Sequence, residues 1–336
     1  MGIPVKQAAR IGAYVLKQHL LGRSHYPLVL MLEPLFRCNL ACSGCGKIDY
    51  PDPILNQRLS YDQCMEAIDE CGAPAVSIAG GEPLLHKDMP EIVKGYLKRK
   101  KFVILCTNAL LLAKKIDQYT PHENFTWSIH LDGDREMHDQ SVNLEGTYDS
   151  MSPGYAYERA PDQEHFLNRE RTKKLFRDIL SRGNGGKNWA FTQSELFLDF
   201  LAGNQTYHCT PWSMPLRTVF GWQKPCYLLG EGYAKTFREL MEGTEWEKYG
   251  VGNYEKCANC MVHCGFEGTA VADSVKHPWK IVPIALRGVK TTGPMAPDIP
   301  LDKQRPAEYV FSRHVETKLA EIREGKTPPK KTMAAE

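Results

Sequence analysis

Three cysteines lie within eight positions in the stretch RCNLACSGCG (37–46): Cys38, Cys42 and Cys45, a CxxxCxxC spacing. Thiols this close together in a chain kept reduced indicate metal ligation or catalysis more than disulfides. A structural zinc site usually takes four protein ligands, and the nearest further cysteines fall on a predicted helix, where they are expected to pack as small apolar groups. Three thiolates fit better with an iron–sulfur cluster whose fourth iron stays open to a small molecule.

Strand-like apolar runs alternate with helical patterns on both sides of this loop, and the first run leads directly into the cysteines. This β-α-β rhythm predicts parallel strands joined by helices, in a closed or partial β/α barrel or in an open doubly wound sheet. The predicted strands are 26–36, 75–83, 102–112 and 125–133, and the predicted helices are 58–74 and 88–101.

The helix over 58–74 carries its own start and stop signals. Ser60 is a candidate N-cap, with Gln63 three residues later completing a capping box. Gly72 and Pro74 are expected to end the helix.

One interval does not fit the β-α rhythm. After residue 133 the next strand-like segment begins near residue 152, and the stretch between is too short for a further β-α unit of roughly 30 residues. Either the chain lacks one β-α unit, or a segment is missing near 145–152, and we favour the missing segment.

Composition limits the function classes. The chain has 336 residues and a formal net charge of +2, so no strong field points to nucleic acid as a partner. It shows no signal-peptide layout and no apolar run of membrane-spanning length. We therefore expect a cytoplasmic protein in which the 11 cysteines are reduced.

A second motif follows the second predicted strand, which ends in Gly80, Gly81, Glu82 and Pro83. The CxxxCxxC loop together with this GGEP segment resembles the radical S-adenosylmethionine (SAM) superfamily. The resemblance implies a partial (β/α)6-type barrel, a [4Fe–4S] cluster on the three cysteines of the loop, and SAM bound at the open iron near the GGEP residues.

Further SAM contacts are implied on the third and fourth strands. Alternate residues of a strand share a face, so Cys106 lies on the side of Asn108, and Ser128 on the side of His130. The resemblance implies that Asn108, Ser128 and His130 contact SAM. Cys106 is either a buried small side chain or a hydrogen-atom donor facing the SAM cavity.

One acidic residue interrupts the first apolar strand. Glu33 would need a partner or a role if it were buried there, and neither if it lay at an exposed strand end.

The resemblance narrows to the radical SAM proteins of hopanoid biosynthesis, the adenosyl-hopene transferases. It implies that the 5′-deoxyadenosyl radical adds to the terminal alkene of hopene (diploptene), giving adenosylhopane. This addition leaves a tertiary radical, and the Cys106 thiol is the candidate donor of the hydrogen atom that quenches it. Hopene and an electron donor such as flavodoxin or ferredoxin are the implied partners. The similar segments are YPLVLMLEPLFRCNLACSGCGKIDYPDPILN, SIAGGEPLLHKDMP, LCTNALLL, HLDGDREMHD, SPGYAYERAPDQEHFL and HCTPWSMPLRTVFGWQKPCYLLGEGY.

The N-terminal segment 1–24 predicts an amphipathic helix. Its apolar side gathers Val5, Ala8, Ala9, Gly12, Leu16 and Leu20, and its basic side carries Lys6, Arg10 and Lys17. Such a helix either lies at a membrane surface, which would suit a triterpene substrate and place the protein at the inner face of the membrane, or docks on the barrel.

The second half of the chain contains five further cysteines: Cys209, Cys226, Cys257, Cys260 and Cys264. They resemble the C-terminal extensions of radical SAM enzymes that bind auxiliary clusters, although four or five thiols could equally hold zinc or remain unliganded. We therefore expect the core barrel over 25–205, a cysteine-containing extension over 206–320 and a disordered tail over 321–336.

Two rival interpretations remain open on the sequence alone. The first is a radical SAM enzyme that modifies a peptide with the help of an auxiliary cluster. The second is a non-enzymatic iron–sulfur or zinc interaction module, which would not cleave SAM.

Overall fold

The computed structural model describes residues 5–42, 45–129, 168–187, 191, 193–308 and 313–325. Contacts divide the chain into two compact units, neither of them continuous in sequence. The sheet unit is assembled from Val29–Gln163, Pro215–Glu242 and Val310–Glu336. The helical unit is assembled from Met1–Leu28, Glu164–Met214 and Gly243–Tyr309.

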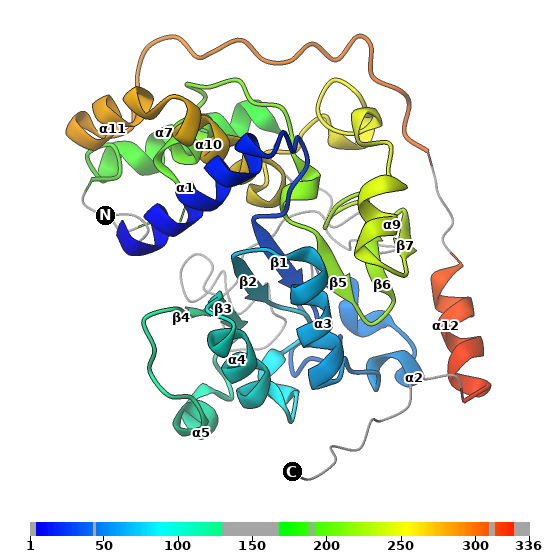
Figure 1. Ribbon diagram of the computed structural model, residues 1–336. Helices are drawn as coiled ribbons and strands as arrows, with labels where there is room; N and C mark the ends of the chain where they lie inside the picture. Colours follow the sequence, from blue (N-terminus) through cyan, green and yellow to red (C-terminus); the bar gives the residue numbers. More distant parts are fainter. Residues whose placement is uncertain are drawn as a thin grey trace. The chain divides into compact units, whose positions relative to one another are not determined.

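A single sheet organises the sheet unit, with the strand order β4-β3-β2-β1-β5-β6-β7 among the described residues (Figure 1). Strands β1 to β4 are parallel, β5 is parallel to β1, and β6 and β7 continue as antiparallel strands. This α/β fold with an open, largely parallel sheet confirms the predicted fold class. The strands are β1 (Val29–Leu32), β2 (Ala75–Ile78), β3 (Phe102–Thr107), β4 (Phe125–Ile129), β5 (Leu216–Thr218), β6 (Gly221–Lys224) and β7 (Gly232–Ala234).

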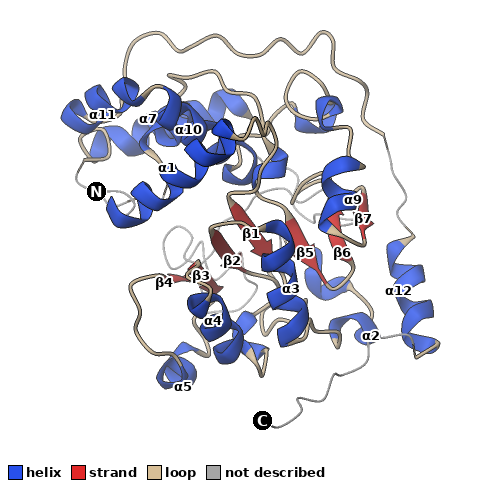
Figure 2. Ribbon diagram, in the orientation of Figure 1, coloured by secondary structure: helices blue, strands red, loops and turns tan. Residues whose placement is uncertain are grey.

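Three helices lie in a row along the sheet, with α3 (Tyr61–Cys71) in contact with both α4 (Met89–Lys98) and α9 (Phe237–Glu242) (Figure 2). The crossovers from β1 to β2 and from β2 to β3 run through α3 and α4, as the alternating pattern predicts. Further helices of this unit are α2 (Asp52–Leu55), α5 (Leu112–Lys115) and α12 (His314–Arg323), with 3₁₀ turns at Gly46–Asp49, Pro83–Leu85 and Ile116–Gln118.

The predicted capping box at the start of α3 is confirmed in full. The Ser60 hydroxyl accepts from the Gln63 amide, and the Gln63 side chain accepts from the Ser60 amide. Gly72 ends the helix in the left-handed region, at a φ of 68°.

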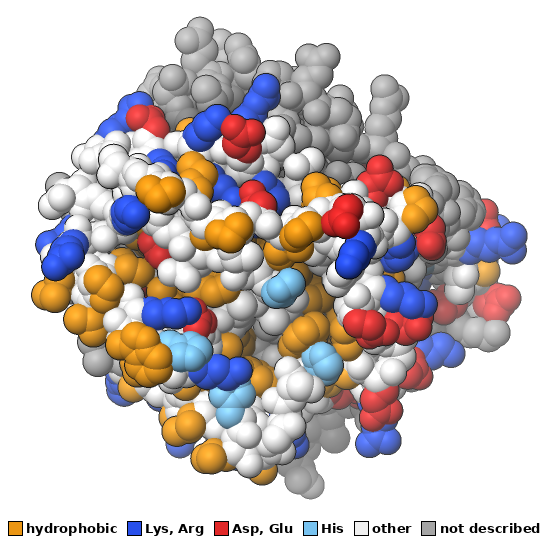
Figure 3. All heavy atoms as spheres, turned by 90° about the horizontal axis from the view of Figure 1, so that it is seen from above, with side chains coloured by type: hydrophobic (Ala, Val, Ile, Leu, Met, Phe, Trp, Pro, Cys, Tyr) orange, Lys and Arg blue, Asp and Glu red, His pale blue; other side chains and the backbone are white. Residues whose placement is uncertain are grey.

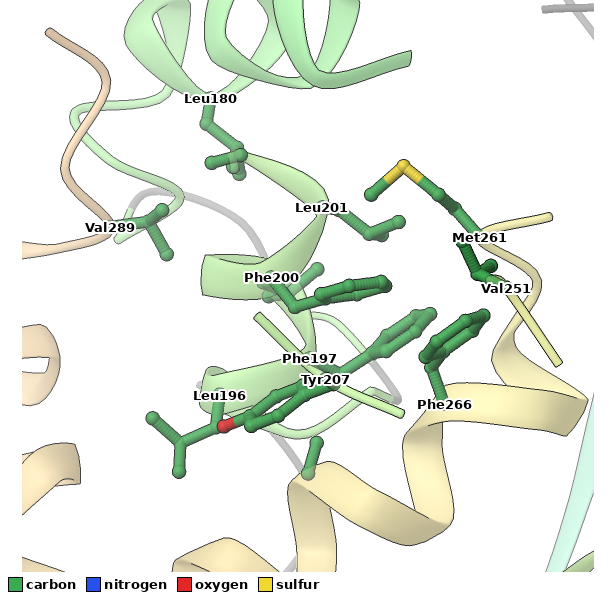
Figure 4. Packing of buried hydrophobic residues seen from close by; sticks show 13 residues of the cluster. Leu180, Leu196, Phe197, Phe200, Leu201, Tyr207, Val251, Met261, Phe266 and Val289 are labelled. Atoms are coloured by element: carbon green, nitrogen blue, oxygen red, sulfur yellow. The ribbon is translucent and has the colours of Figure 1, made fainter. Parts of the chain in front are cut away.

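The helical unit is built around a separate aromatic core, shown in Figure 4. Phe200 stacks on Phe266 with ring centroids 4.7 Å apart, and Tyr207 packs against Phe200 while donating to Asp273. The helices of this unit are α1 (Val5–Leu20), α7 (Arg169–Arg182), α8 (Glu195–Leu201), α10 (His263–Lys276) and α11 (Ile281–Arg287). Its 3₁₀ turns are Pro211–Ser213, Trp246–Lys248, Glu255–Cys257 and Pro278–Lys280.

Helix α1 forms where the sequence predicts an amphipathic helix, but it packs through a different face. It contacts α10, and its buried side chains include Val15 and Gln18. Leu16 and Leu20, two members of the predicted apolar side, are 52% and 80% exposed. The predicted apolar side is therefore not the face that α1 packs against the protein.

The domain boundaries predicted from the sequence differ from the boundaries of the two compact units. Strands β5 to β7 fall within the predicted extension 206–320, yet they extend the same sheet as β1. This happens because the chain returns to pair with the free edge of β1. The predicted strand near 152, the missing segment near 145–152 and the last eleven residues of the predicted tail lie outside the described residues.

Glu267 on α10 gives the helical unit a testable pH dependence. One carboxylate oxygen accepts from the Ser194 amide at 2.8 Å, and the other has no hydrogen-bond partner among the described residues. Burial raises the pKa of this carboxyl group to about 7. A pKa above the ordinary value of 4.5 means that the folded state binds the proton more tightly. Stability from this group is therefore lost as the pH rises through 7.

We expect wild-type protein to lose about 2 kcal/mol of unfolding free energy between pH 5 and pH 9 that Glu267→Gln does not lose. Urea titrations of the two proteins at both pH values measure the difference, because the amide keeps the acceptor for Ser194 without a charge. If the unfolding free energies of the two proteins changed equally between the two pH values, the pKa of Glu267 would be the same in the folded and the unfolded chain, and the prediction would be wrong.

Candidate functional site

The CxxxCxxC loop leaves the carboxyl end of β1, where ligand sites of parallel sheets usually form. Cys38, Cys42 and Cys45 are all partly exposed, and the Cys45 amide donates to the Cys42 carbonyl at 3.0 Å. Burial raises the pKa of the Cys38 thiol, and the nearby Glu82 and Cys45 add to the shift. Among the described residues no three His, Cys, Asp or Glu side chains gather closely enough to hold a metal ion. The donor chemistry of the loop, three thiols on one turn, nevertheless fits an iron–sulfur cluster with one open iron.

The glycine pair of the GGEP segment is required by close backbone approach to this loop. A Cβ on Gly81 would lie 2.2 Å from the Arg37 carbonyl oxygen, and one on Gly80 would lie 2.5 Å from that of Leu35. The Gly81 amide donates to Leu35 and the Glu82 amide to Arg37, each at 3.0 Å. These amides are thus paired within the protein, and they hold the GGEP segment against the residues that lead into the cysteines.

Glu82 ties the end of β2 to the end of β3. Its buried carboxylate accepts from the Leu84 amide, the Thr107 hydroxyl and the Asn108 amide at 2.8 to 3.0 Å. Pro83 begins the 3₁₀ turn that follows. The structure thus gives Glu82 a positioning role, while contact of Gly80, Gly81, Glu82 and Pro83 with SAM stays a prediction.

Asn108 lies beside the cysteine loop, as the predicted site requires. Its side-chain amide donates to Asn39 at 2.8 Å and approaches the Cys38 sulfur at 3.9 Å. Asn39, within the loop itself, is a site residue that the sequence analysis did not single out.

Glu33 is buried, and the structure supplies its partner. Glu33 and Lys47 are 2% and 4% exposed and form an ion pair, and Lys47 also donates to the Gly80 carbonyl and the Tyr227 hydroxyl, each at 3.3 Å. The charge of Lys47 lowers the pKa of Tyr227, but burial and Glu33 raise it further, to about 12. The Tyr227 hydroxyl therefore stays protonated near neutral pH. This pair joins the end of β1 to the residue two positions after Cys45.

Cys106 occupies the sheet face predicted for it. It lies between Ser77 on β2, 3.8 Å away, and its direct cross-strand neighbour Ser128 on β4. Burial raises the pKa of the Cys106 thiol, which both serine hydroxyls partly offset. The thiol is therefore protonated at neutral pH. His130 lies outside the described residues.

Four of the five later cysteines belong to the helical unit, and Cys226 belongs to the sheet unit. The Cys209 sulfur lies so close to the residue after Cys264 that a Cβ on Gly265 would approach it to 2.6 Å. The Cys257–Cys260 turn is closed by a backbone hydrogen bond of 3.0 Å, and the buried Arg169 donates to the Cys260 carbonyl at 2.7 Å. Tertiary structure thus brings Cys209 to the segment that carries the other three.

Comparison with known families agrees with the site. Residues 32–160 match the profile of the radical SAM superfamily, and residues 150–284 match a domain of unknown function, DUF3463. The matched part of the chain, which contains the cysteine loop and β2 to β4, is therefore a radical SAM domain. Such a domain takes a [4Fe–4S] cluster and SAM as cofactors, which confirms both predictions.

Individual relatives resemble only part of the chain. The GTP 3′,8-cyclase of Clostridium perfringens (strain SM101 / Type A) is 29% identical over 121 residues, which are 34% of this chain and 38% of the cyclase. The AdoMet-dependent heme synthase of Methanosarcina barkeri is 26% identical over 165 residues, 48% of this chain and 47% of the synthase. The chain thus spans less than half the length of these relatives. The crystal structure of Streptococcus suis SuiB bound to S-adenosylmethionine aligns with a TM-score of 0.48 at 14% identity, over 61% of each chain.

Besides Asn39, sequence reasoning also missed Lys47 and Tyr227 as site residues. The sequence did indicate that a buried Glu33 would need a partner, because Glu33 is an acidic residue within an apolar predicted strand. Sequence could not choose the cation, because the chain has 42 Lys and Arg residues and Tyr227 lies 180 positions beyond Lys47.

Replacing Lys47 with Met should strongly destabilise the sheet unit, because the buried Glu33 carboxylate loses its cation. We expect a loss of about 3–5 kcal/mol of unfolding free energy, measured by denaturant titration of anaerobically purified protein. Glu33→Gln combined with Lys47→Met should recover part of that loss.

The matched control is Lys94→Met, which breaks an exposed pair with Glu91 at 2.7 Å and should change stability by less than about 1 kcal/mol. A coupling energy near zero in the Glu33–Lys47 cycle would show that the buried pair contributes nothing to stability.

Proposed function

We propose that this protein is a radical SAM adenosyltransferase that joins the adenosyl C5′ to the terminal alkene of hopene, forming adenosylhopane. The proposal rests on the resemblance to adenosyl-hopene transferases and on the position of Cys106. The reduced cluster with bound SAM supplies the 5′-deoxyadenosyl group in radical form. The protein's own residues position the reactants, exclude water and complete the product.

The cluster and SAM sites are proposed at one end of the sheet. Cys38, Cys42 and Cys45 hold the cluster, with Asn108 close to the Cys38 sulfur. Gly80 to Pro83, Asn108, Ser128 and His130 line the SAM site. The ion pair of Glu33 with Lys47 attaches the cysteine loop to the end of β1, since Lys47 lies two positions after Cys45.

The position of Cys106 is the observation that supports the transfer reaction. Addition at the terminal methylene leaves a tertiary carbon radical that needs a hydrogen atom. A protonated thiol on the same face as Ser128, a proposed SAM contact, can give that atom, because an S–H bond is weaker than the C–H bond formed. One electron and one proton from an external donor, such as flavodoxin or ferredoxin, then restore the thiol.

Cys106→Ala tests this role directly. Anaerobic incubation with SAM, a reductant and diploptene, followed by mass analysis, should show methionine release at the wild-type rate but adenosylhopane reduced by about tenfold or more. The matched control is Cys64→Ala, which removes a fully buried thiol from helix α3 and should leave the product yield unchanged.

Normal adenosylhopane yield from Cys106→Ala would rule out the thiol as hydrogen donor. Absence of any adenosylated triterpene from wild-type protein that still cleaves SAM would rule out the proposed reaction itself.

The alternative is a radical SAM enzyme that modifies a peptide with an auxiliary metal centre. Its support is the approach of Cys209 to the segment that carries Cys257, Cys260 and Cys264. A deoxyadenosine product together with an altered peptide, in place of an adenosylated lipid, would favour this function.

A second centre in the helical unit can be tested by metal analysis. If these four cysteines bind zinc or an auxiliary cluster, Cys260→Ser should lose that metal and keep the iron of the first cluster. Cys42→Ser should show the converse. Cys226→Ser, in the other unit, is the matched control and should keep both. Unchanged amounts of zinc, iron and sulfide per chain in Cys260→Ser would rule out a second metal centre in the helical unit.

A further inference from the structure

The helical unit exposes an apolar stripe along α1 that the protein itself leaves uncovered. Ala9, Ala13, Leu16 and Leu20 follow a spacing of four, three and four residues, so they share one side of the helix. Leu20 is 80% exposed and the following Leu21 is 55% exposed. Exposure this large at leucine is unusual for a helix whose opposite side is packed in a core.

A second exposed apolar stripe lies on α11 and the turn before it. Trp279, Val282 and Leu286 are spaced by three and four residues and are 64%, 55% and 68% exposed. The opposite side of the helix, with Ile281 and Ile284, packs against the aromatic core. Helix α11 is therefore apolar on both sides, although only one side is covered by protein.

Both stripes belong to elements that are linked to α10. Helix α1 contacts α10, and α10 contacts the turn that carries Trp279. Burial lowers the pKa of His19 and the charge of Lys276 lowers it further, which places the end of α1 near the end of α10. Figure 3 shows hydrophobic side chains gathered with Lys, Arg and His on the left of the face in view. We call the exposed apolar residues of the two stripes and the Lys and Arg residues of the same two segments, 1–32 and 274–297, the docking surface. Its apolar members are Ala9, Ala13, Leu16, Leu20, Leu21, Trp279, Val282 and Leu286.

The two segments that carry the stripes are rich in basic residues. Residues 1–32 contain four Lys or Arg and no acid, and residues 274–297 likewise contain four and none. The carboxylate of Asp273, just before the second segment, is paired with His277 and Lys280. A chain with a net charge of only +2 thus concentrates basic residues in the segments that carry its exposed leucines and Trp279.

We propose that the docking surface binds the headgroup region of an anionic phospholipid bilayer. Leucine and tryptophan side chains favour the boundary between headgroups and acyl chains, and flanking Lys and Arg favour anionic lipid. A protein partner of the same shape would have to be acidic around an apolar centre, whereas a bilayer offers both features over any area. No described helix is long and apolar enough to cross the bilayer, so the contact is at the surface. The proposal does not depend on hopene as substrate.

Vesicle sedimentation of the full-length holoprotein tests the proposal without turnover. Vesicles of phosphatidylcholine with about one third phosphatidylglycerol should bind the protein at low salt, and binding should weaken with salt and with phosphatidylcholine alone. Replacing Leu20, Trp279 and Leu286 together with Ala should weaken binding by at least about tenfold. Replacing Lys17, Lys276 and Arg287 with Gln should weaken it roughly a hundredfold.

Matched controls lie on the sheet unit. Leu110 and Ile116 are exposed to 42% and 44%, and their replacement with Ala should leave binding unchanged. Replacing Lys87, Lys94 and Lys98 with Gln removes the same charge from another surface and should weaken binding far less. Thermal unfolding of each variant confirms folding.

Three results would overturn the proposal. One is no binding of wild-type protein to anionic vesicles at low salt, and another is equal losses from the docking-surface and control variants. The third is a concentration-dependent dimer in sedimentation velocity that the same apolar replacements abolish, because a second copy of the chain would then cover the surface. Since SAM cleavage and adenosylhopane formation in detergent are measured separately, failure here is distinguishable from failure of the proposed function.

Discussion

Close backbone approach between the chain after β1 and the chain after β2 is the constraint on which the site depends. Parallel pairing continues beyond both strands, so that Gly81 and Glu82 donate to the carbonyls of Leu35 and Arg37. Any side chain at Gly81 would collide with the carbonyl oxygens of Phe36 and Arg37. The GGEP segment and the cysteine loop are consequently held at one edge of the sheet, and Asn108, at the end of β3, reaches the loop because Glu82 binds its amide.

Buried charge is placed where it stabilises this arrangement. The pair of Glu33 with Lys47 crosses from the end of β1 to the turn after the cysteines, and Lys47 also binds the Gly80 carbonyl. A buried carboxylate without a cation is strongly unfavourable, so the loop gains a fixed position at the cost of desolvating two charges. Such a buried pair is a poor source of net stability compared with apolar packing, but it does specify which groups must meet. Its position beside the cysteines indicates that the pair serves to position the cysteine loop, which a contribution to net stability would not explain.

The two units differ in what their surfaces and cysteines are suited to do. The sheet unit presents its polar face, with Ser77, Cys106 and Ser128 in a row across three strands, where a small molecule can be held by a rigid scaffold. The helical unit surrounds an aromatic core, brings Cys209 to the later cysteines, and exposes leucine, tryptophan and basic residues on α1 and α11.

The sequence alone determined the local features of this protein. It predicted strands β1 to β4, helix α3 with its capping box, and the cysteine loop, because periodicity, capping and ligand spacing are encoded in neighbouring residues. Tertiary structure decided the rest. Strands of three residues such as β5 and β7 carry too little pattern to detect. The partner of Glu33, the proximity of Cys209 to Cys264 and the exposed side of α1 depend on contacts between distant segments. Those contacts are set by how the whole chain packs, which no local pattern contains.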